Sequence, residues 1–133
     1  MGLFDNPYKY CDTDREKQAI NNPEHRKFAR EIARKCVIML KNENNLLPLS
    51  RNVKIALIGP LGKSKGDMLG SWNVTWPDNS DVISQFEGLE KQVGKENLLY
   101  AKGCELIDTS KVGFADAIAV ANKADVVILS VGE

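Results

Sequence analysis

The chain has 133 residues, of which 43% are hydrophobic and 27% charged, a composition that argues against disorder and fits one domain with a real core. Basic and acidic side chains balance at 18 each, with 13 of the basic ones in residues 1–66 and 11 of the acidic ones in residues 67–133. Because nucleic-acid-binding domains normally carry a basic excess, this balance argues against nucleic acid as a partner. No apolar run approaches the roughly 18 to 20 residues needed to span a bilayer, so we expect no membrane insertion.

The N-terminal third predicts an arm followed by one strong helix. Residues 1–22 are polar and aromatic, with too few apolar side chains for a core of their own, so they are expected to form an irregular linker. A helix is predicted over residues 23–41, with Asn22 as its cap and Pro23 in its first turn. Apolar side chains recur every fourth residue along it, which predicts core packing for the stripe, Cys36 included: Phe28, Ile32, Cys36 and Leu40. A row of arginines (Arg26, Arg30 and Arg34) forms a separate polar face.

The rest of the chain alternates strands with helices. Apolar runs predict strands, and amphipathic or Ala-rich runs predict helices, the first of them capped by Ser80 or Asp81. The expected strands are 53–58, 98–101 and 125–131, and the expected helices run to about Val93 and over 114–124. This order predicts a three-layer α/β sandwich with a mostly parallel sheet of flavodoxin-like topology. With only three strands, the sandwich is expected to be incomplete.

One glycine-containing turn raises a nucleotide-binding hypothesis. Residues 59–64 (GPLGKS) follow a strand, as a phosphate-binding loop does. Only two residues separate the first glycine from Gly62-Lys63-Ser64, whereas the motif needs four, and no helix is expected directly after Ser64. A tight turn therefore explains these residues better.

The candidate functional residues are two tryptophans and a glutamate. Trp72 and Trp76 lie in a long loop after the first strand, where parallel sheets carry their ligand crevice. Indole faces suit the C–H face of a sugar ring, although both side chains could equally serve packing. Glu133 follows the last strand, where a carboxylate can act as an acid or base.

Cysteine and histidine usage predicts no metal site and no cofactor. The cysteines, Cys11, Cys36 and Cys104, form no C-x-x-C pair, and His25 is the only histidine. A Cys11–Cys104 disulfide is left open by the sequence, and with it the redox compartment.

Several strings resemble glycoside hydrolase family three β-glucosidases of the bacterial periplasmic or secreted type. Residues 2–8 (GLFDNPY) resemble the segment that leaves the family's catalytic barrel, and residues 39–49, with MLKNE and LLPL, resemble its linking helix. Residues 54–60 (KIALIGP), 124–128 (ADVVI) and 131–133 (VGE) resemble strands and the active-site loop of its second domain. The resemblance implies an interdomain linker at residues 1–45, with its helix at 23–41, and the first part of the C-terminal α/β sandwich domain at residues 46–133.

The resemblance also implies an activity and roles for individual residues. Family members hydrolyse terminal β-D-glucosyl residues with retention, using two carboxyl groups. Glu133 matches the candidate acid/base, although a later glutamate serves in some members. Trp76 matches a leaving-group clamp, supported by Trp72. The nucleophile is an Asp of the barrel domain and has no counterpart here, so the chain alone is expected to be an inactive fragment.

The resemblance further implies a β-glucoside or β-gluco-oligosaccharide substrate, the barrel domain as partner, and a periplasmic or secreted location. The alternative is a non-catalytic flavodoxin-like module that binds carbohydrate or docks on a protein through its arginine row.

Overall fold

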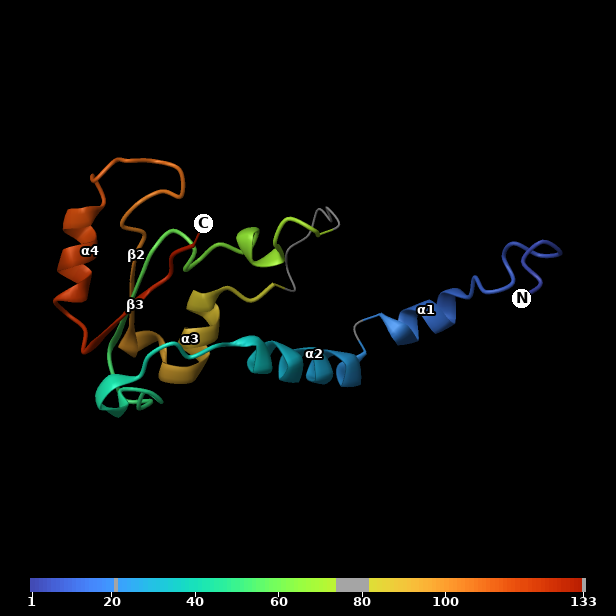
Figure 1. Ribbon diagram of the computed structural model, residues 1–133, viewed down its shortest axis with the longest axis horizontal. Helices are drawn as coiled ribbons and strands as arrows, with labels where there is room; N and C mark the ends of the chain where they lie inside the picture. The colour runs from blue at the N-terminus through green and yellow to red at the C-terminus, as the bar shows by residue number, and fades with distance from the viewer. Residues whose placement is uncertain (21, 74–81, 133) are drawn as a thin grey trace. The chain divides into compact units, whose positions relative to one another are not determined.

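The computed structural model describes residues 1–20, 22–73 and 82–132 and divides the chain into two units, Met1–Leu46 and Leu47–Glu133 (Figure 1). The first unit contains the helices α1 (Thr13–Ala19) and α2 (Pro23–Cys36) and the short 3-10 helix η1 (Glu43–Asn45). The second unit contains the following elements: β1 (Ile55–Ile58), η2 (Asp67–Leu69), α3 (Gln85–Val93), η3 (Lys95–Asn97), β2 (Leu98–Ala101), α4 (Phe114–Ala121) and β3 (Val126–Leu129).

The first unit contains a helix that the sequence analysis missed. Residues 1–22 were expected to be irregular, but Asp12 starts α1 by accepting hydrogen bonds from the backbone N–H groups of Asp14 and Arg15, both at 3.0 Å. Aspartate is a common N-cap, because its side chain accepts from the free N–H groups of the first helical turn. The polar composition of residues 1–22 obscured this signal.

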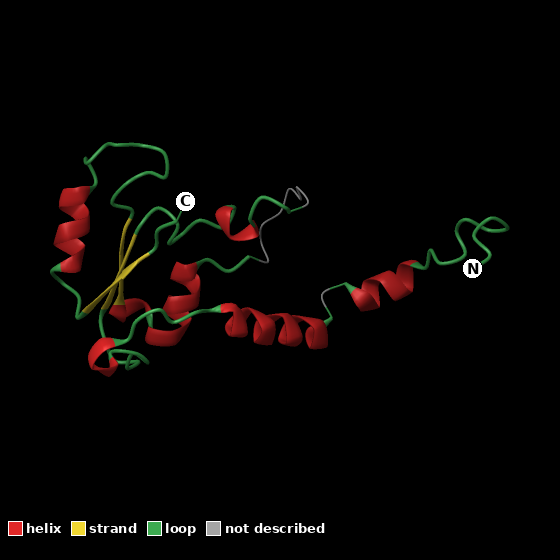
Figure 2. Cartoon of the chain, viewed as in Figure 1, coloured by secondary structure: helices red, strands yellow, loops and turns green. Residues whose placement is uncertain are grey.

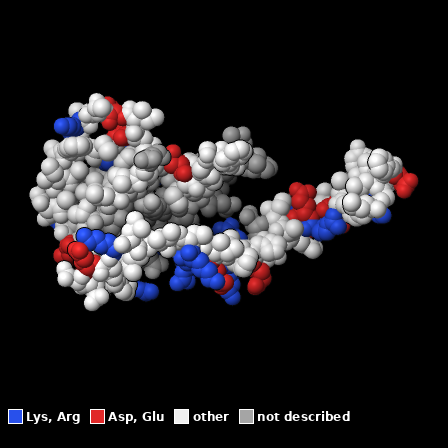
Figure 3. All heavy atoms as spheres, in the orientation of Figure 1, with Lys and Arg blue, Asp and Glu red and all other residues white. Residues whose placement is uncertain are grey.

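Helix α2 begins as predicted and ends earlier. Asn22 caps it through a 2.9 Å hydrogen bond from the N–H of Glu24. The helix ends at Cys36 and not near residue 41, because Val37 adopts extended backbone angles at the start of a run with two β-branched residues. The predicted core packing of its apolar stripe is wrong: no described residue of α2 is buried, Phe28 is 64% exposed and Cys36 is exposed. The arginine row of α2 is also exposed, with acidic side chains interspersed (Figure 3).

The second unit is a parallel α/β sandwich, as predicted. Its three strands lie in the order β2-β1-β3, and both pairs are parallel, with Ile55 opposite Leu98 and Val126. The central strand β1 is buried along its whole length. Figure 2 shows α3 and α4 on either side of the sheet, which makes three layers.

Alternation along β1 assigns its side chains to two faces. Ile55 and Leu57 form the core with Leu98, and α3 covers this face with three apolar side chains, Phe86, Leu89 and Val93. Ile58 points to the other face, where a side chain at Gly103 would contact both Ile58 and Ala117 of α4.

Several predicted boundaries were too wide. Strands β1 and β3 and helix α4 are shorter than the apolar runs that predicted them, and β2 alone has the predicted bounds. Helix α3 is capped by Ser84 and not by Ser80 or Asp81, which lie outside the described residues. Ser84 and Glu87 form a capping box, in which the hydroxyl of Ser84 accepts from the N–H of Glu87 at 3.2 Å and the carboxylate of Glu87 accepts from the N–H of Ser84 at 2.8 Å.

Candidate functional site

The order of the strands defines one edge of the sheet as the candidate site. From β1 the chain passes through α3 to β2 on one side, and from β2 it returns through α4 to β3 on the other side of β1. The connections therefore diverge between the carboxyl ends of β1 and β3. In doubly wound parallel sheets, ligands bind in the crevice at such a switch point.

Backbones approach closely at this switch point. The N–H of Ser130 donates to the carbonyl of Ile58 at 2.7 Å, and the N–H of Gly59 donates to the carbonyl of Ala101 at 3.1 Å. Both hydrogen bonds extend the strand pairing past the strand ends. They fix the starts of two segments, residues 59–73 after β1 and residues 130–132 after β3.

Ser130 is a buried polar residue at the same place. It is 4% exposed, and its hydroxyl has no hydrogen-bond partner among the described residues. Its N–H is hydrogen-bonded to β1, so this side chain lies at the start of the segment that leads to Glu133.

The segment after β1 is fastened to the start of α3. The N–H of Phe86 donates to the carbonyl of Gly62 at 2.9 Å. The ammonium of Lys63 lies 4.1 Å from the centre of the Phe86 ring and 4.4 Å from that of Tyr100. Lys65 pairs with Glu87 at 2.8 Å. The hydrogen bond from Lys65, then those from the backbone and hydroxyl of Ser84, lower the pKa of Glu87 from 4.5 to about 2.

This arrangement also answers the nucleotide-binding hypothesis. A phosphate-binding loop directs its lysine at phosphate and is followed at once by a helix. Here Lys63 lies over two aromatic rings, and residues 64–66 form no helix. The tight-turn interpretation of residues 59–64 fits this geometry.

One of the candidate ligand residues can be placed. Trp72 is 99% exposed in the loop after β1, so it is available for stacking and does not pack against the described residues. Trp76 and Glu133 lie outside the described residues. Their roles stay predictions.

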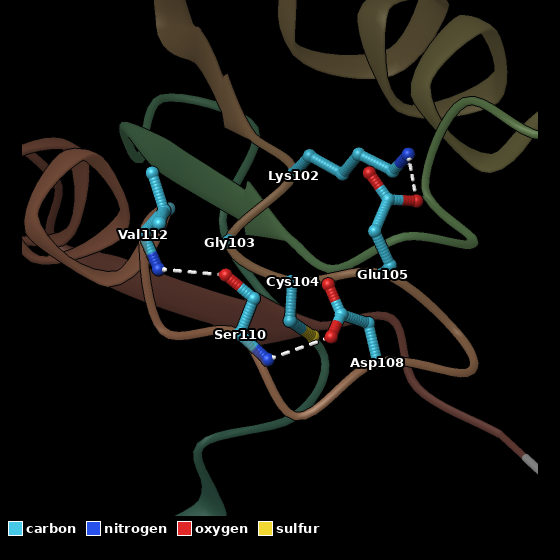
Figure 4. A pocket seen from close by; sticks show the side chains of 8 residues that line it. Lys102, Gly103, Cys104, Glu105, Asp108, Ser110 and Val112 are labelled. Carbon is cyan, nitrogen blue, oxygen red and sulfur yellow. Dashed lines mark hydrogen bonds and ion pairs between the residues drawn. The ribbon is translucent and has the colours of Figure 1, made fainter.

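A pocket that sequence reasoning missed lies at the carboxyl end of β2 (Figure 4). Its volume is about 260 Å³, and residues 102–113 supply its lining. The side chains of Lys102 and Glu105 point toward one another and form an ion pair, which raises the pKa of Lys102. Asp108 accepts from the N–H of Ser110 at 3.0 Å. Both carboxylates are thus used by the loop itself. The sequence signal for this pocket was the run of polar residues that follows the apolar strand β2.

All three cysteines are free thiols. Among the described residues, no group of three or more His, Cys, Asp or Glu could hold a metal ion. His25 is an exposed residue of α2. None of the helices in the described ranges has the length and apolar character that crossing a bilayer requires.

The fold defines the class of protein: a doubly wound parallel α/β domain with its switch point between the carboxyl ends of β1 and β3. Comparison with known proteins gives the family. Residues 37–133 match the glycosyl hydrolase family 3 C-terminal domain, and the chain belongs to this family.

Individual relatives agree with this assignment. The chain is 42% identical to a beta-xylosidase of Formosa agariphila, over 99% of the chain and 19% of the relative, and 35% identical to a periplasmic beta-glucosidase of Salmonella typhimurium, over 100% and 20%. Among solved structures, the beta-glucosidase of Listeria innocua in complex with isofagomine superimposes with a TM-score of 0.85 at 33% identity, over 99% of this chain and 18% of that one. The chain thus spans about a fifth of the length of these relatives.

Proposed function

We propose that this chain acts as part of a retaining β-glucosidase, in which it forms the start of the second domain beside a catalytic barrel. The proposal rests on the family of the chain and on the switch point of its sheet. There, hydrogen bonds to β1 and β2 hold the first residues of the two segments that lead to Trp72 and Trp76 and to Glu133. The substrate would be a β-glucoside or a β-gluco-oligosaccharide.

The roles of the candidate residues follow from the chemistry of retention. Glu133 would protonate the glycosidic oxygen as the leaving group departs and then activate water, while an Asp of the barrel acts as the nucleophile. Trp76 would stack on the leaving-group sugar, with Trp72 beside it. Because this chain supplies no nucleophile, we expect it to hydrolyse nothing alone.

A β-xylosidase activity is the second candidate, and a specific observation favours it: the relative with 42% identity is a beta-xylosidase. The two activities differ in whether the non-reducing sugar carries a hydroxymethyl group. Rates on matched aryl β-glucosides and aryl β-xylosides, measured as kcat/KM in the longer protein that carries this sequence, distinguish them.

The acid/base role is tested by Glu133→Gln in that longer protein. General acid catalysis contributes about 10²- to 10⁴-fold, so kcat/KM of the variant, which reports the glycosylation step, should fall by about that much on an alkyl β-glucoside. Its kcat/KM should fall far less on a dinitrophenyl β-glucoside, whose leaving group departs without a proton. Glu105→Gln, whose carboxylate pairs with Lys102, is the matched control. Equal losses on both substrates, or none, would assign the role to another glutamate.

We also propose a periplasmic or secreted location for the longer protein. The resemblance to bacterial enzymes of this type and the periplasmic beta-glucosidase of Salmonella typhimurium support it. Osmotic-shock fractionation of the native cells, with a cytoplasmic marker enzyme as reference, tests the location directly.

The alternative is a non-catalytic module that docks on a protein through Arg26, Arg30 and Arg34. It predicts no glycoside hydrolysis and no change in tryptophan fluorescence when sugar is added. Titration of the chain with gluco-oligosaccharides, followed by tryptophan fluorescence, separates the two. A change that Trp76→Ala abolishes supports the sugar site.

A further inference from the structure

We infer that Lys63 is a positioning residue, which holds the loop that carries Trp72 against β2 and α3. The inference deepens the proposed function and rests on it for the step from loop position to sugar binding. It concerns a lysine that contacts no reacting group, about nine positions before Trp72 in the chain.

The first step is the latch itself, defined as the contacts of residues 62–65 with β2 and α3. Lys63 lies over two rings that are packed edge to face, with centroids 5.8 Å apart at an interplanar angle of 77°. One ring belongs to α3 and the other to β2, so a single ammonium connects the loop to two elements. The hydrogen bond from Phe86 to Gly62 and the ion pair of Lys65 with Glu87 lie on either side of it.

The second step is the path from the latch to Trp72. Ser64 donates to the carboxylate of Asp67 at 2.5 Å, and the N–H of Asp67 donates back to its hydroxyl at 3.2 Å. Leu69 then donates to Gly66 at 3.1 Å, and Gly70 to Asp67 at 3.2 Å. The side-chain amide of Asn73 donates to the carbonyl of Gly70. Overlapping turns therefore lead from the latch to Gly70, and the hydrogen bond from Asn73 to Gly70 spans Trp72.

The third step is that Trp72 has no other hydrogen bond or packing contact among the described residues of this unit. It is 99% exposed, so its position depends on the backbone that carries it. A cation above an aromatic face is held by the quadrupole of the ring, and an arginine guanidinium can take the same place. A methionine has similar length and no charge, so it removes the attraction while keeping most of the apolar contact.

The experiment uses Trp72 as its own reporter. With Trp76→Phe as background, Trp72 is the only tryptophan of the 133-residue chain, and time-resolved fluorescence anisotropy measures its local motion. Lys63→Met should at least double the amplitude of the fast component, and Lys63→Arg should restore it. Lys91→Met, which changes an exposed lysine of α3, is the control and should leave it unchanged. Circular dichroism checks that each variant is folded.

The sugar step is measured separately in the longer protein. If the latch sets the sugar-binding position of Trp72, Lys63→Met should raise KM for a gluco-oligosaccharide about five- to thirtyfold, the range expected for losing two exposed cation–π contacts. The value of kcat should change by less than twofold, and Lys63→Arg should reverse the rise in KM.

The outcomes separate the two proposals. If the anisotropy of Trp72 stays unchanged in Lys63→Met, the positioning role of Lys63 is overturned, and if it also stays unchanged in the double variant with Lys65→Met, the whole latch is overturned. If Trp72 loosens and KM stays the same, the positioning role in sugar binding is overturned. If Trp72 loosens as expected in a longer protein that hydrolyses no glycoside, the latch stands and the proposed function fails.

Discussion

Gly59 and Ser130 approach so closely that a Cβ atom on Gly59 would lie 2.1 Å from the backbone oxygen of Ser130. Gly59 also has a φ of +134°, which side chains of L-residues rarely adopt. The two residues stand at the carboxyl ends of β1 and β3. Their contact brings the start of the loop that carries Trp72 close to the start of the segment that leads to Glu133. This close approach requires a glycine at position 59.

Replacing Gly59 by alanine should therefore be strongly destabilising. Backbone strain of about 1 to 3 kcal/mol adds to overpacking of about 1 to 3 kcal/mol, so we expect the free energy of unfolding to fall by about 2 to 6 kcal/mol. Urea denaturation followed by circular dichroism measures it. Gly66→Ala is the matched control, since Gly66 has a negative φ and open space around it, and its effect should stay within about 1 kcal/mol. Equal effects of the two would show that the contact with Ser130 is relaxed in solution.

The sheet was predicted well from the sequence, because its strands are runs of apolar residues. The strand at residues 98–101 was predicted at its exact bounds, and the alternation of strands and helices gave the parallel topology. Strand ends were too wide because apolar residues such as Val53 pack against the core from outside the strand.

The errors have physical reasons too. Helix α3 was started too early because polar residues around residue 80 look like caps, whereas the pattern Ser84-x-x-Glu87 is the more specific signal. The apolar stripe of α2 shows only that a helix has one apolar face, and it does not say what covers that face. The latch of Lys63 joins residues far apart in the chain, so no local pattern could reveal it.

Removal of the capping hydroxyl should cost stability. Ser84 is 3% exposed and its hydroxyl both accepts from the N–H of Glu87 and contacts the Glu87 carboxylate at 3.0 Å. Ser84→Ala should lower the free energy of unfolding by about 1 to 2 kcal/mol, the usual cost of losing an N-cap. Thermal and urea denaturation measure the loss. Ser71→Ala, at an exposed loop position, should be neutral by comparison; a neutral Ser84→Ala would mean that water replaces the cap.

The ion pair of Lys65 and Glu87 should make stability depend on pH in the acid range. The pKa of Glu87 falls from 4.5 to about 2 on folding, so its contribution is complete above about pH 4.5. Between pH 4.5 and about pH 2 the unfolded state binds a proton and the folded state does not, and the contribution is lost.

The measurement compares Tm from pH 2 to pH 6 in the wild-type chain and in Glu87→Gln. The difference in Tm should be largest near pH 6 and should vanish near pH 2, and 0.5 M salt should reduce it, since both side chains are partly exposed. Lys91→Met should leave the profile unchanged. A constant difference across the range would show that folding does not lower the pKa of Glu87.

The last prediction separates the two roles of Tyr100. Its hydroxyl donates to the carbonyl of Gly59 at 3.3 Å, while its ring lies beneath Lys63. Tyr100→Phe removes only the hydrogen bond and should cost about 1 kcal/mol. Tyr100→Leu also removes the ring from Lys63 and Phe86, and we expect about 1 kcal/mol more. If the latch acts through the ring, Tyr100→Leu should also loosen Trp72 while Tyr100→Phe leaves it unchanged. Urea denaturation and tryptophan anisotropy in the Trp76→Phe background measure the two effects, and equal values for both variants would limit Tyr100 to its hydrogen bond.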